Sequence, residues 1–212
     1  MLEWAAYIKI LVALLVIVDP LAAIPSFIIM AGHFTDADRT KIARVASIAV
    51  ATVLIVSALL GDSILAFFGI SISAFKVAGA ILIFFMAISM LQVKQVRDKQ
   101  TEEEEAEAQD KHSIAVVPIA IPLLAGPGAI STTIIYATEH PGWQHRLVIV
   151  ACCLLVGVAC WIGLRAAAPV SRLLGKTGIN IAVRLMGLIL TAVAVEIFVS
   201  GLLVLMPGLK GH

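Results

Sequence analysis

Apolar residues follow one another along this chain in long blocks, and charged residues stand mainly between the blocks. Four stretches contain no Asp, Glu, Lys or Arg: 45–61, 77–93, 113–138 and 147–164. A helix needs about 20 mostly apolar residues to cross the hydrocarbon core of a membrane. The pattern therefore predicts six transmembrane helices, near residues 7–30, 42–61, 72–92, 114–138, 146–166 and 181–205.

The composition agrees with an all-α membrane protein and disfavours other classes. Hydrophobic residues make up 61% of the 212 positions and charged residues 14%, whereas a soluble domain is nearer half apolar and a quarter charged. The mean hydropathy is +1.06. The net charge is only +1, without a basic stripe carrying interleaved aromatic residues, so we expect lipid and no nucleic acid as a partner.

The residues that usually perform catalysis do not form recognisable motifs. Cys152, Cys153 and Cys160 all fall in one predicted span, without a C-x-x-C pair, and the five histidines show no metal-ligand spacing. Pairs typical of hydrolytic or redox sites are also missing from the sequence. We therefore expect no enzymatic activity, no metal and no cofactor.

Lys and Arg are distributed unevenly among the segments that join the spans. Eleven lie after spans one, three and five, and four lie on the opposite side: Lys9, Lys76, Arg146 and Lys210. Because cytoplasmic segments carry the excess of basic residues, the pattern predicts both termini outside. The charged segment 94–112 is then a cytoplasmic linker between a first three-helix unit, 1–93, and a second, 113–212.

Helix-breaking residues interrupt two of the predicted spans at positions 107 residues apart. Asp19-Pro20 lies inside the first span and Gly126-Pro127 inside the fourth. Proline lacks an N–H group and frees a carbonyl, which is costly where lipid surrounds the helix. Two such interruptions at matching positions are typical of a transporter built from repeats, with its binding site at the breaks.

A second similarity supports an internal repeat. Residues 76–82 (Lys-Val-Ala-Gly-Ala-Ile-Leu) match residues 184–190 (Arg-Leu-Met-Gly-Leu-Ile-Leu) at an offset of 108. Chance is the alternative explanation, because apolar segments share a small alphabet. Three spans per half is an odd number, so the second half must cross the membrane upside down. The sequence thus predicts two inverted three-helix repeats, with spans one and four discontinuous.

The two breaks offer groups of opposite charge. Pro20 and Pro127 suit the first position of a new half-helix, with Asp19 and Gly126 as the residues before it. Free amides at the start of the second half-helix form an anion site, while the Asp19 carboxylate attracts a cation. The flanking residues are small, which predicts a small zwitterion such as glycine or alanine. The candidate substrate-binding residues are Asp19, Pro20, Ala22, Ala23, Pro25, Gly126, Pro127, Gly128, Ala129, Ser131 and Thr132.

Several of these side chains also have a purely structural interpretation. Asp19 is the candidate for proton coupling, because an intramembrane acid is usually functional, yet it could equally serve only as a helix N-cap. For Ser131, Thr132 and Thr133 we expect at least two hydroxyls to bond back to carbonyls of their own helix. Lys76 and Glu196 lie about one turn inside the outer surface, and we expect them to form an ion pair between the repeats.

The interrupted segments resemble a known family. Asp19-Pro20 with Pro25, and the run from Pro122 to Ile130, are similar to the two signatures of the MarC family, also called the small neutral amino acid transporter (SnatA) family. The resemblance implies a bacterial or archaeal inner-membrane protein that exports glycine, alanine and similar amino acids, coupled to protons. This chain has Ala22 where the family usually has Gly, and Ala23 where it often has Asn, which leaves fewer hydrogen-bonding groups.

Our first hypothesis is therefore a secondary transporter of small neutral amino acids that works by alternating access. A passive channel for small polar solutes would use the same broken helices, and a non-transport membrane scaffold is the third possibility. A scaffold would not need two interrupted spans.

Overall fold

The computed structural model describes residues 4–31, 34–92 and 124–209, and every regular element among them is a helix. The expected all-α fold is confirmed. In chain order the elements are α1 (Trp4–Val18), α2 (Ala23–Ala31), α3 (Asp36–Phe67), α4 (Ile72–Gln92), α7 (Pro127–Thr138), α8 (Trp143–Arg165), α9 (Ala167–Leu205) and the short 3₁₀ helix η3 (Pro207–Leu209).

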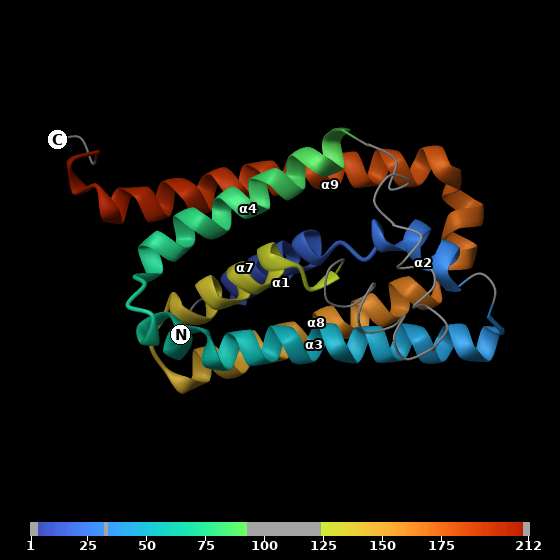
Figure 1. The fold of residues 1–212 in the computed structure, drawn as a ribbon, viewed down its shortest axis with the longest axis horizontal. Helices are drawn as coiled ribbons and strands as arrows, with labels where there is room; N and C mark the ends of the chain where they lie inside the picture. Colours follow the sequence, from blue (N-terminus) through green and yellow to red (C-terminus); the bar gives the residue numbers. More distant parts are fainter. Residues whose placement is uncertain (1–3, 32–33, 93–123, 210–212) are drawn as a thin grey trace.

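The long helices lie side by side along one axis (Figure 1). α4 packs against α9 on one side of the bundle, and α3 packs against α8 on the other. α1 and α7 lie between these two pairs: α7 contacts α3 and α4, and α1 contacts α8 and α9. The central position of α1 and α7 places both predicted breaks inside the bundle.

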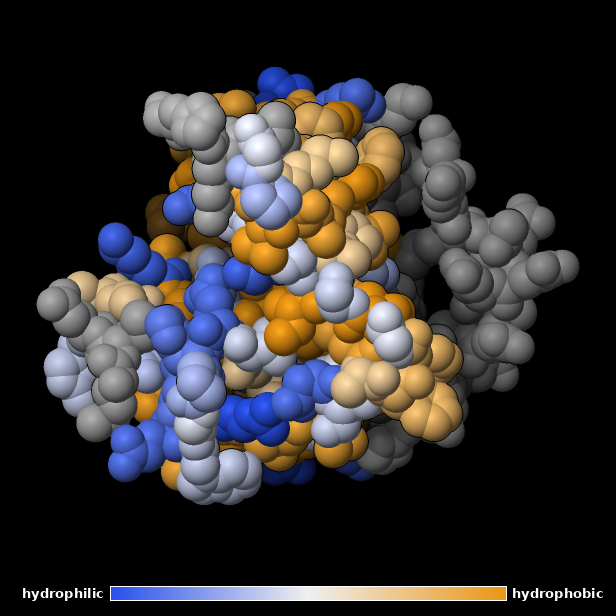
Figure 2. All heavy atoms as spheres, turned by 90° about the vertical axis from the view of Figure 1, so that its left-hand side faces the viewer, coloured by the Kyte–Doolittle hydropathy of each residue, from blue (hydrophilic) through white to orange (hydrophobic). Residues whose placement is uncertain are grey.

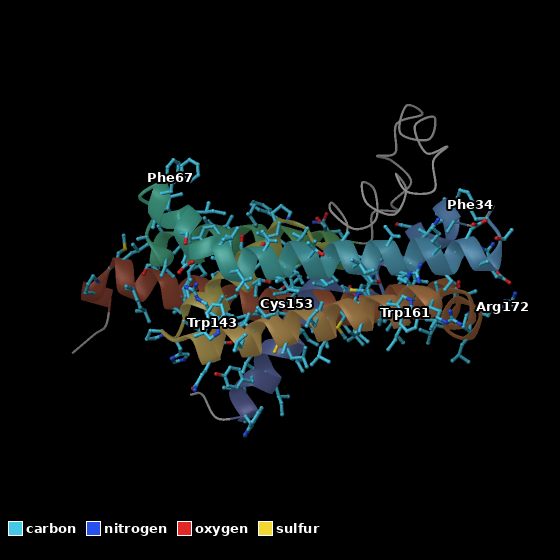
Figure 3. All side chains as sticks on the ribbon, turned by 90° about the horizontal axis from the view of Figure 1, so that it is seen from below. Phe34, Phe67, Trp143, Cys153, Trp161 and Arg172 are labelled. Atoms are coloured by element: carbon cyan, nitrogen blue, oxygen red, sulfur yellow. The ribbon has the colours of Figure 1, made fainter. Side chains whose placement is uncertain are left out.

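The two ends of the bundle carry different residues. Phe67 and Trp143 lie toward one end, Phe34 and Arg172 toward the other, and Cys153 lies between them (Figure 3). We call the first of these the Phe67 end. Figure 2 looks onto it and shows hydrophilic residues gathered among hydrophobic ones.

Four helical segments among the described residues are long and apolar enough to cross a membrane: α3, α4, α8 and the Thr177–Leu205 part of α9. α1 and α2 form a fifth when the bent pair is counted as one span. The expected fourth span, 114–138, lies outside the described residues as far as residue 123. Large apolar side chains cover the outward faces of the long helices, among them Ile48, Leu60, Phe85, Leu154 and Leu188. Such a surface suits a lipid environment.

Two helices extend beyond the spans that hydropathy predicts. α3 begins at Asp36, after Thr35, whose Oγ1 accepts a hydrogen bond of 3.3 Å from the Asp38 amide. With this N-cap the helix begins among polar residues that precede the predicted span. α9 begins at Ala167 and kinks at Gly175, where φ is 62° and ψ is 179°. Glycine adopts this left-handed conformation without steric cost.

Glycines permit close contact within both outer helix pairs. A Cβ placed on Gly157 of α8 would lie 2.7 Å from the Ala51 Cβ and 3.3 Å from the Ser47 carbonyl oxygen of α3. A Cβ on Gly201 of α9 would lie 3.0 Å from the Ser73 carbonyl oxygen of α4. Small residues let helix backbones approach in a membrane, where packing replaces the hydrophobic effect between helices.

Replacing Gly157 by Val should destabilise the protein, because the added side chain must push α3 and α8 apart. Overpacking of this kind costs about 1–3 kcal/mol. Thermal unfolding of the purified protein in detergent measures the loss. Gly208→Val is the matched control, because a Cβ at Gly208 meets nothing within 4 Å. Equal melting temperatures for the two variants would contradict this account of the α3–α8 contact.

Candidate site at the two helix breaks

The first span is interrupted at Asp19, as predicted. α1 ends at Val18, and the Asp19 amide donates the last bond of that helix to the Leu15 carbonyl at 2.9 Å. Asp19 has a φ of 41° and is the one non-glycine with positive φ in the described ranges. α2 starts at Ala23, and the two helices meet at an angle of 41°. Asp is among the few residues that accept the left-handed conformation needed here.

Within the described residues, only one oxygen of the Asp19 carboxylate forms a hydrogen bond. Its Oδ1 accepts a hydrogen bond of 3.2 Å from the Ala22 amide, which is an N-cap interaction for the turn that leads into α2. The side chain is buried, with 4% of the residue exposed. Among the described residues, Oδ2 is buried and has no hydrogen-bond partner. Leaving a buried polar atom unpaired is costly, so this oxygen is suited to receive a donor from outside the fold.

The second half-helix, α7, begins at Pro127 as predicted. Gly126 is its N-cap with an extended conformation, φ −65° and ψ 172°, and no side chain caps it. The first bond that α7 makes with its own N-cap runs from the Ile130 amide to the Gly126 carbonyl at 3.2 Å. The amides of Gly128 and Ala129 precede it and lie at the positive end of the helix dipole. This end of α7 can bind an anion.

The structure brings the start of α7 against the last turn of α1. A Cβ placed on Gly128 would lie 3.9 Å from Cγ2 of Ile17, two residues before Asp19. The same Cβ would lie 3.4 Å from Cγ1 of Ile83 and 3.7 Å from Sδ of Met86, both on α4. Gly163 of α8 faces the other side of the break, where its Cβ would lie 3.1 Å from the Pro20 Cβ.

The predicted site residues differ in how deeply they are buried. Seven are buried: Asp19, Ala23, Gly126, Gly128, Ala129, Ser131 and Thr132. Three are half-buried: Pro20, Ala22 and Pro25. Pro127 is exposed. The structure thus places the break residues of both segments mainly in the interior, and the first turn of α7 contacts α1 directly.

The side chains of Ser131, Thr132 and Thr133 on α7 differ in their contacts. Thr133 Oγ1 donates to the Ala129 carbonyl at 2.8 Å, which is the expected back-bond. Ser131 packs instead on α4, where its Cβ lies 2.9 Å from a Cβ placed on Gly79. Thr132 is fully buried, and its Oγ1 has no partner among the described residues. The expected back-bond is thus confirmed for Thr133, and Thr132 does not form one among the described residues.

Lys76 pairs with a residue other than the predicted Glu196. Its Nζ lies 3.3 Å from Oε1 of Glu139, the C-cap residue of α7. Glu196 is exposed on α9. The α9 residue beside Lys76 is Gly201, whose Cβ would lie 3.0 Å from the Lys76 Cβ. Glu196 stands five positions earlier, about 7.5 Å along the helix. Among the described residues no ion pair joins it to Lys76, so the expected pair is corrected.

The residues that surround the two breaks were not predicted from the sequence. Ile83 and Met86 of α4 close the side of Gly128, and Gly163 of α8 closes the side of Pro20. These residues belong to no motif and lie in unbroken spans. Only the packing of α4 and α8 against the broken segments identifies them.

The left-handed conformation of Asp19 can be tested with two variants that both remove the carboxylate. Asp19→Gly fits a positive φ without strain, whereas Asp19→Ala does not, so the Ala variant should be less stable by about 1 kcal/mol. Chemical denaturation in detergent measures the difference. In an ordinary helix Ala is favoured over Gly by about 1 kcal/mol. A more stable Ala variant would therefore mean that the helix is not broken at Asp19.

Comparisons with known proteins agree over nearly the whole chain. Residues 4–206 match the family described as "MarC family integral membrane protein". The chain is 41% identical to "UPF0056 membrane protein YhcE" of Escherichia coli (strain K12), over 98% of this chain and 96% of that protein. It is 40% identical to a UPF0056 membrane protein of Buchnera aphidicola subsp. Schizaphis graminum (strain Sg), over 95% and 94%.

An archaeal relative extends the similarity. A UPF0056 membrane protein of Archaeoglobus fulgidus is 35% identical over 89% of this chain and 88% of its own length. None of these three names carries an enzymatic activity. No solved structure matches the chain. With a buried break in its first span and a family match over almost its full length, this chain belongs to the MarC family of integral membrane proteins.

Proposed function

We propose that this chain is a secondary transporter that exports small neutral amino acids such as glycine and alanine. The observation that carries the proposal is the buried Asp19 carboxylate, whose Oδ2 has no partner among the described residues, inside an interrupted membrane helix. A buried acceptor of this kind needs a donor, and a substrate ammonium group supplies one.

The neighbouring half-helix complements this acceptor. The carboxylate of an amino acid would bind the amides of the first turn of α7, while its ammonium group binds Asp19. The first turn of α7 contacts the last turn of α1 through Gly128 and Ile17, which favours one site served by both breaks. Ile83 and Met86 close around Gly128, so the site favours substrates with little or no side chain.

The arrangement of helices supports the inverted repeat that alternating access needs. We propose six spans, with residues 114–126 completing the fourth. The two outer pairs each join helices that the sequence offset relates, α3 with α8 and α4 with α9. α1 runs away from the Phe67 end, whereas α7 runs toward it (Figure 1). A two-fold relation between the halves predicts these pairings and these opposite directions.

The distribution of basic residues favours one orientation. We propose that the protein lies in the inner (plasma) membrane of a bacterium or archaeon, with both termini and the Phe67 end outside. Arg39, Arg44 and Arg172 lie on segments at the opposite end, with the linker 94–112 assigned to the cytoplasm. The positive-inside rule supports this assignment.

Counterflow of labelled glycine in proteoliposomes tests the proposal. Vesicles preloaded with unlabelled glycine should accumulate the label transiently, and glycine and alanine should compete while phenylalanine and tryptophan should not. A passive channel gives no transient accumulation. Tight binding of large aromatic amino acids to the purified protein would contradict the assignment of a small site.

Asp19→Asn separates the two roles of this residue. Asn tolerates the left-handed conformation and keeps an oxygen for the Ala22 amide, so the variant should fold with a similar melting temperature. Without the charge it should bind glycine at least tenfold more weakly and lose uptake driven by a pH gradient. If Asp19→Asn still concentrates alanine when a pH difference is imposed, Asp19 does not carry the coupled proton.

A further inference from the structure

A chain of hydrogen bonds joins three helices at the Phe67 end. The hydroxyl of Tyr7 on α1 lies 3.1 Å from Nδ1 of His145 on α8. Nε2 of His145 lies 2.7 Å from the main-chain carbonyl oxygen of Tyr136 on α7. His145 is 3% exposed and Tyr7 is 6% exposed. A single buried imidazole therefore holds the ends of α1 and α7 together.

The main-chain carbonyl of Tyr136 determines which groups donate and which accept in this series of hydrogen bonds. A carbonyl oxygen can only accept, so Nε2 of His145 donates to Tyr136. In the neutral ring Nδ1 then accepts, and the Tyr7 hydroxyl donates to it. All polar atoms of the contact are satisfied, which is the arrangement expected of a closed, dry junction.

Other polar contacts at this end also join the first part of the chain to the second. Arg146 of α8 forms an ion pair with Asp62 of α3, and Lys76 of α4 forms one with Glu139 after α7. Among the described residues, the side-chain hydrogen bonds between 4–92 and 124–209 are these two and the Tyr7–His145 contact. All three lie at the Phe67 end.

A cavity lies on the solvent side of the His145 contact. It has a volume of about 330 Å³ and is lined by Tyr7, His145 and the exposed residues 140–144. Trp143, at the start of α8, marks this region in Figure 3. Tyr7 and His145 are its buried members and form its boundary toward the interior.

Buried apolar side chains lie between this cavity and the breaks. Tyr7 precedes Asp19 by twelve residues, about 18 Å of helix, and Tyr136 follows Pro127 by nine residues, about 14 Å. Along α1 the intervening residues Ile10, Leu14 and Ile17 are between 0% and 5% exposed. The cavity is thus separated from the breaks by a buried, apolar stretch of α1, with the polar contacts of Tyr7 and His145 on its solvent side.

From this geometry we infer that Tyr7 and His145 form the outer gate of the transport path. The inference rests on the proposed function, which places a substrate site at the breaks and the Phe67 end outside. His145 is a positioning residue: it holds α1 and α7 together through its two ring nitrogens, and both broken helices must separate here for a substrate to leave. The cavity is the vestibule into which the opened path leads.

Access of a thiol reagent to Leu14 tests the gate without requiring a known substrate. Leu14→Cys is introduced after Cys152, Cys153 and Cys160 have been replaced by Ala, and a membrane-impermeant maleimide is added to right-side-out or inside-out vesicles. With the native gate, labelling from the outer face should be slow. Tyr7→Phe removes only the donated hydroxyl and should speed that labelling about fivefold, because the closed state loses one buried hydrogen bond.

Ser57→Ala is the control. It also removes one hydroxyl, but that hydroxyl donates to the Val53 carbonyl within α3 and takes no part in the gate, so labelling should stay at the native rate. His145→Ala breaks both contacts and should exceed the effect of Tyr7→Phe. General loosening of the fold would speed labelling equally from both faces, whereas an opened gate speeds it from the outer face alone.

The outcomes separate the gate from the proposed function. Equal labelling in the Tyr7→Phe and Ser57→Ala variants, or an equal rise from both faces, would overturn the gate even if glycine counterflow succeeds. A selective rise from the outer face supports it. Should that rise occur in a protein that shows no glycine counterflow, the proposed substrate is wrong and the gate stands.

Discussion

The backbone of a membrane helix must satisfy its own hydrogen bonds, because lipid offers no partners. The first span of this protein meets that requirement at its break with one side chain. The Asp19 amide closes α1 on Leu15, and Oδ1 of Asp19 accepts the Ala22 amide at the start of the next turn. The same carboxylate keeps a second, buried oxygen that has no hydrogen-bond partner in the described part of the chain. One side chain thus caps the break and also supplies the acceptor on which the proposed function depends.

Helix starts and interruptions that depend on a few neighbouring residues could be predicted from the sequence. Proline within an apolar run predicts an interruption, and Gly126-Pro127 marks the start of α7 where the structure has it. Hydropathy alone predicts a shorter α3 than the structure has, because it reports only the part of a helix that lies in lipid. α3 continues through polar residues such as Asp36 and Arg39, which the Thr35 cap supports.

Contacts that depend on the register of one helix against another could not be predicted. Lys76 meets Glu139 because Gly201, and not Glu196, faces the start of α4. The wall that Ile83 and Met86 form around Gly128 has the same origin. His145 stood among five histidines without a motif, and only the meeting of α1, α7 and α8 gives it two partners.

The glycine contacts in the outer pairs also determine where the bundle can deform. At Gly157 the α3 backbone lies so close that sliding α8 lengthwise would drive a neighbouring side chain into the Ser47 carbonyl. Gly201 restricts α9 against α4 in the same way at Ser73. Each pair is consequently a unit whose two helices resist sliding past each other. The same kind of contact holds α7 to both pairs, because a Cβ on Gly61 of α3 would meet Ile134, and one on Gly79 of α4 would lie 2.9 Å from the Ser131 Cβ.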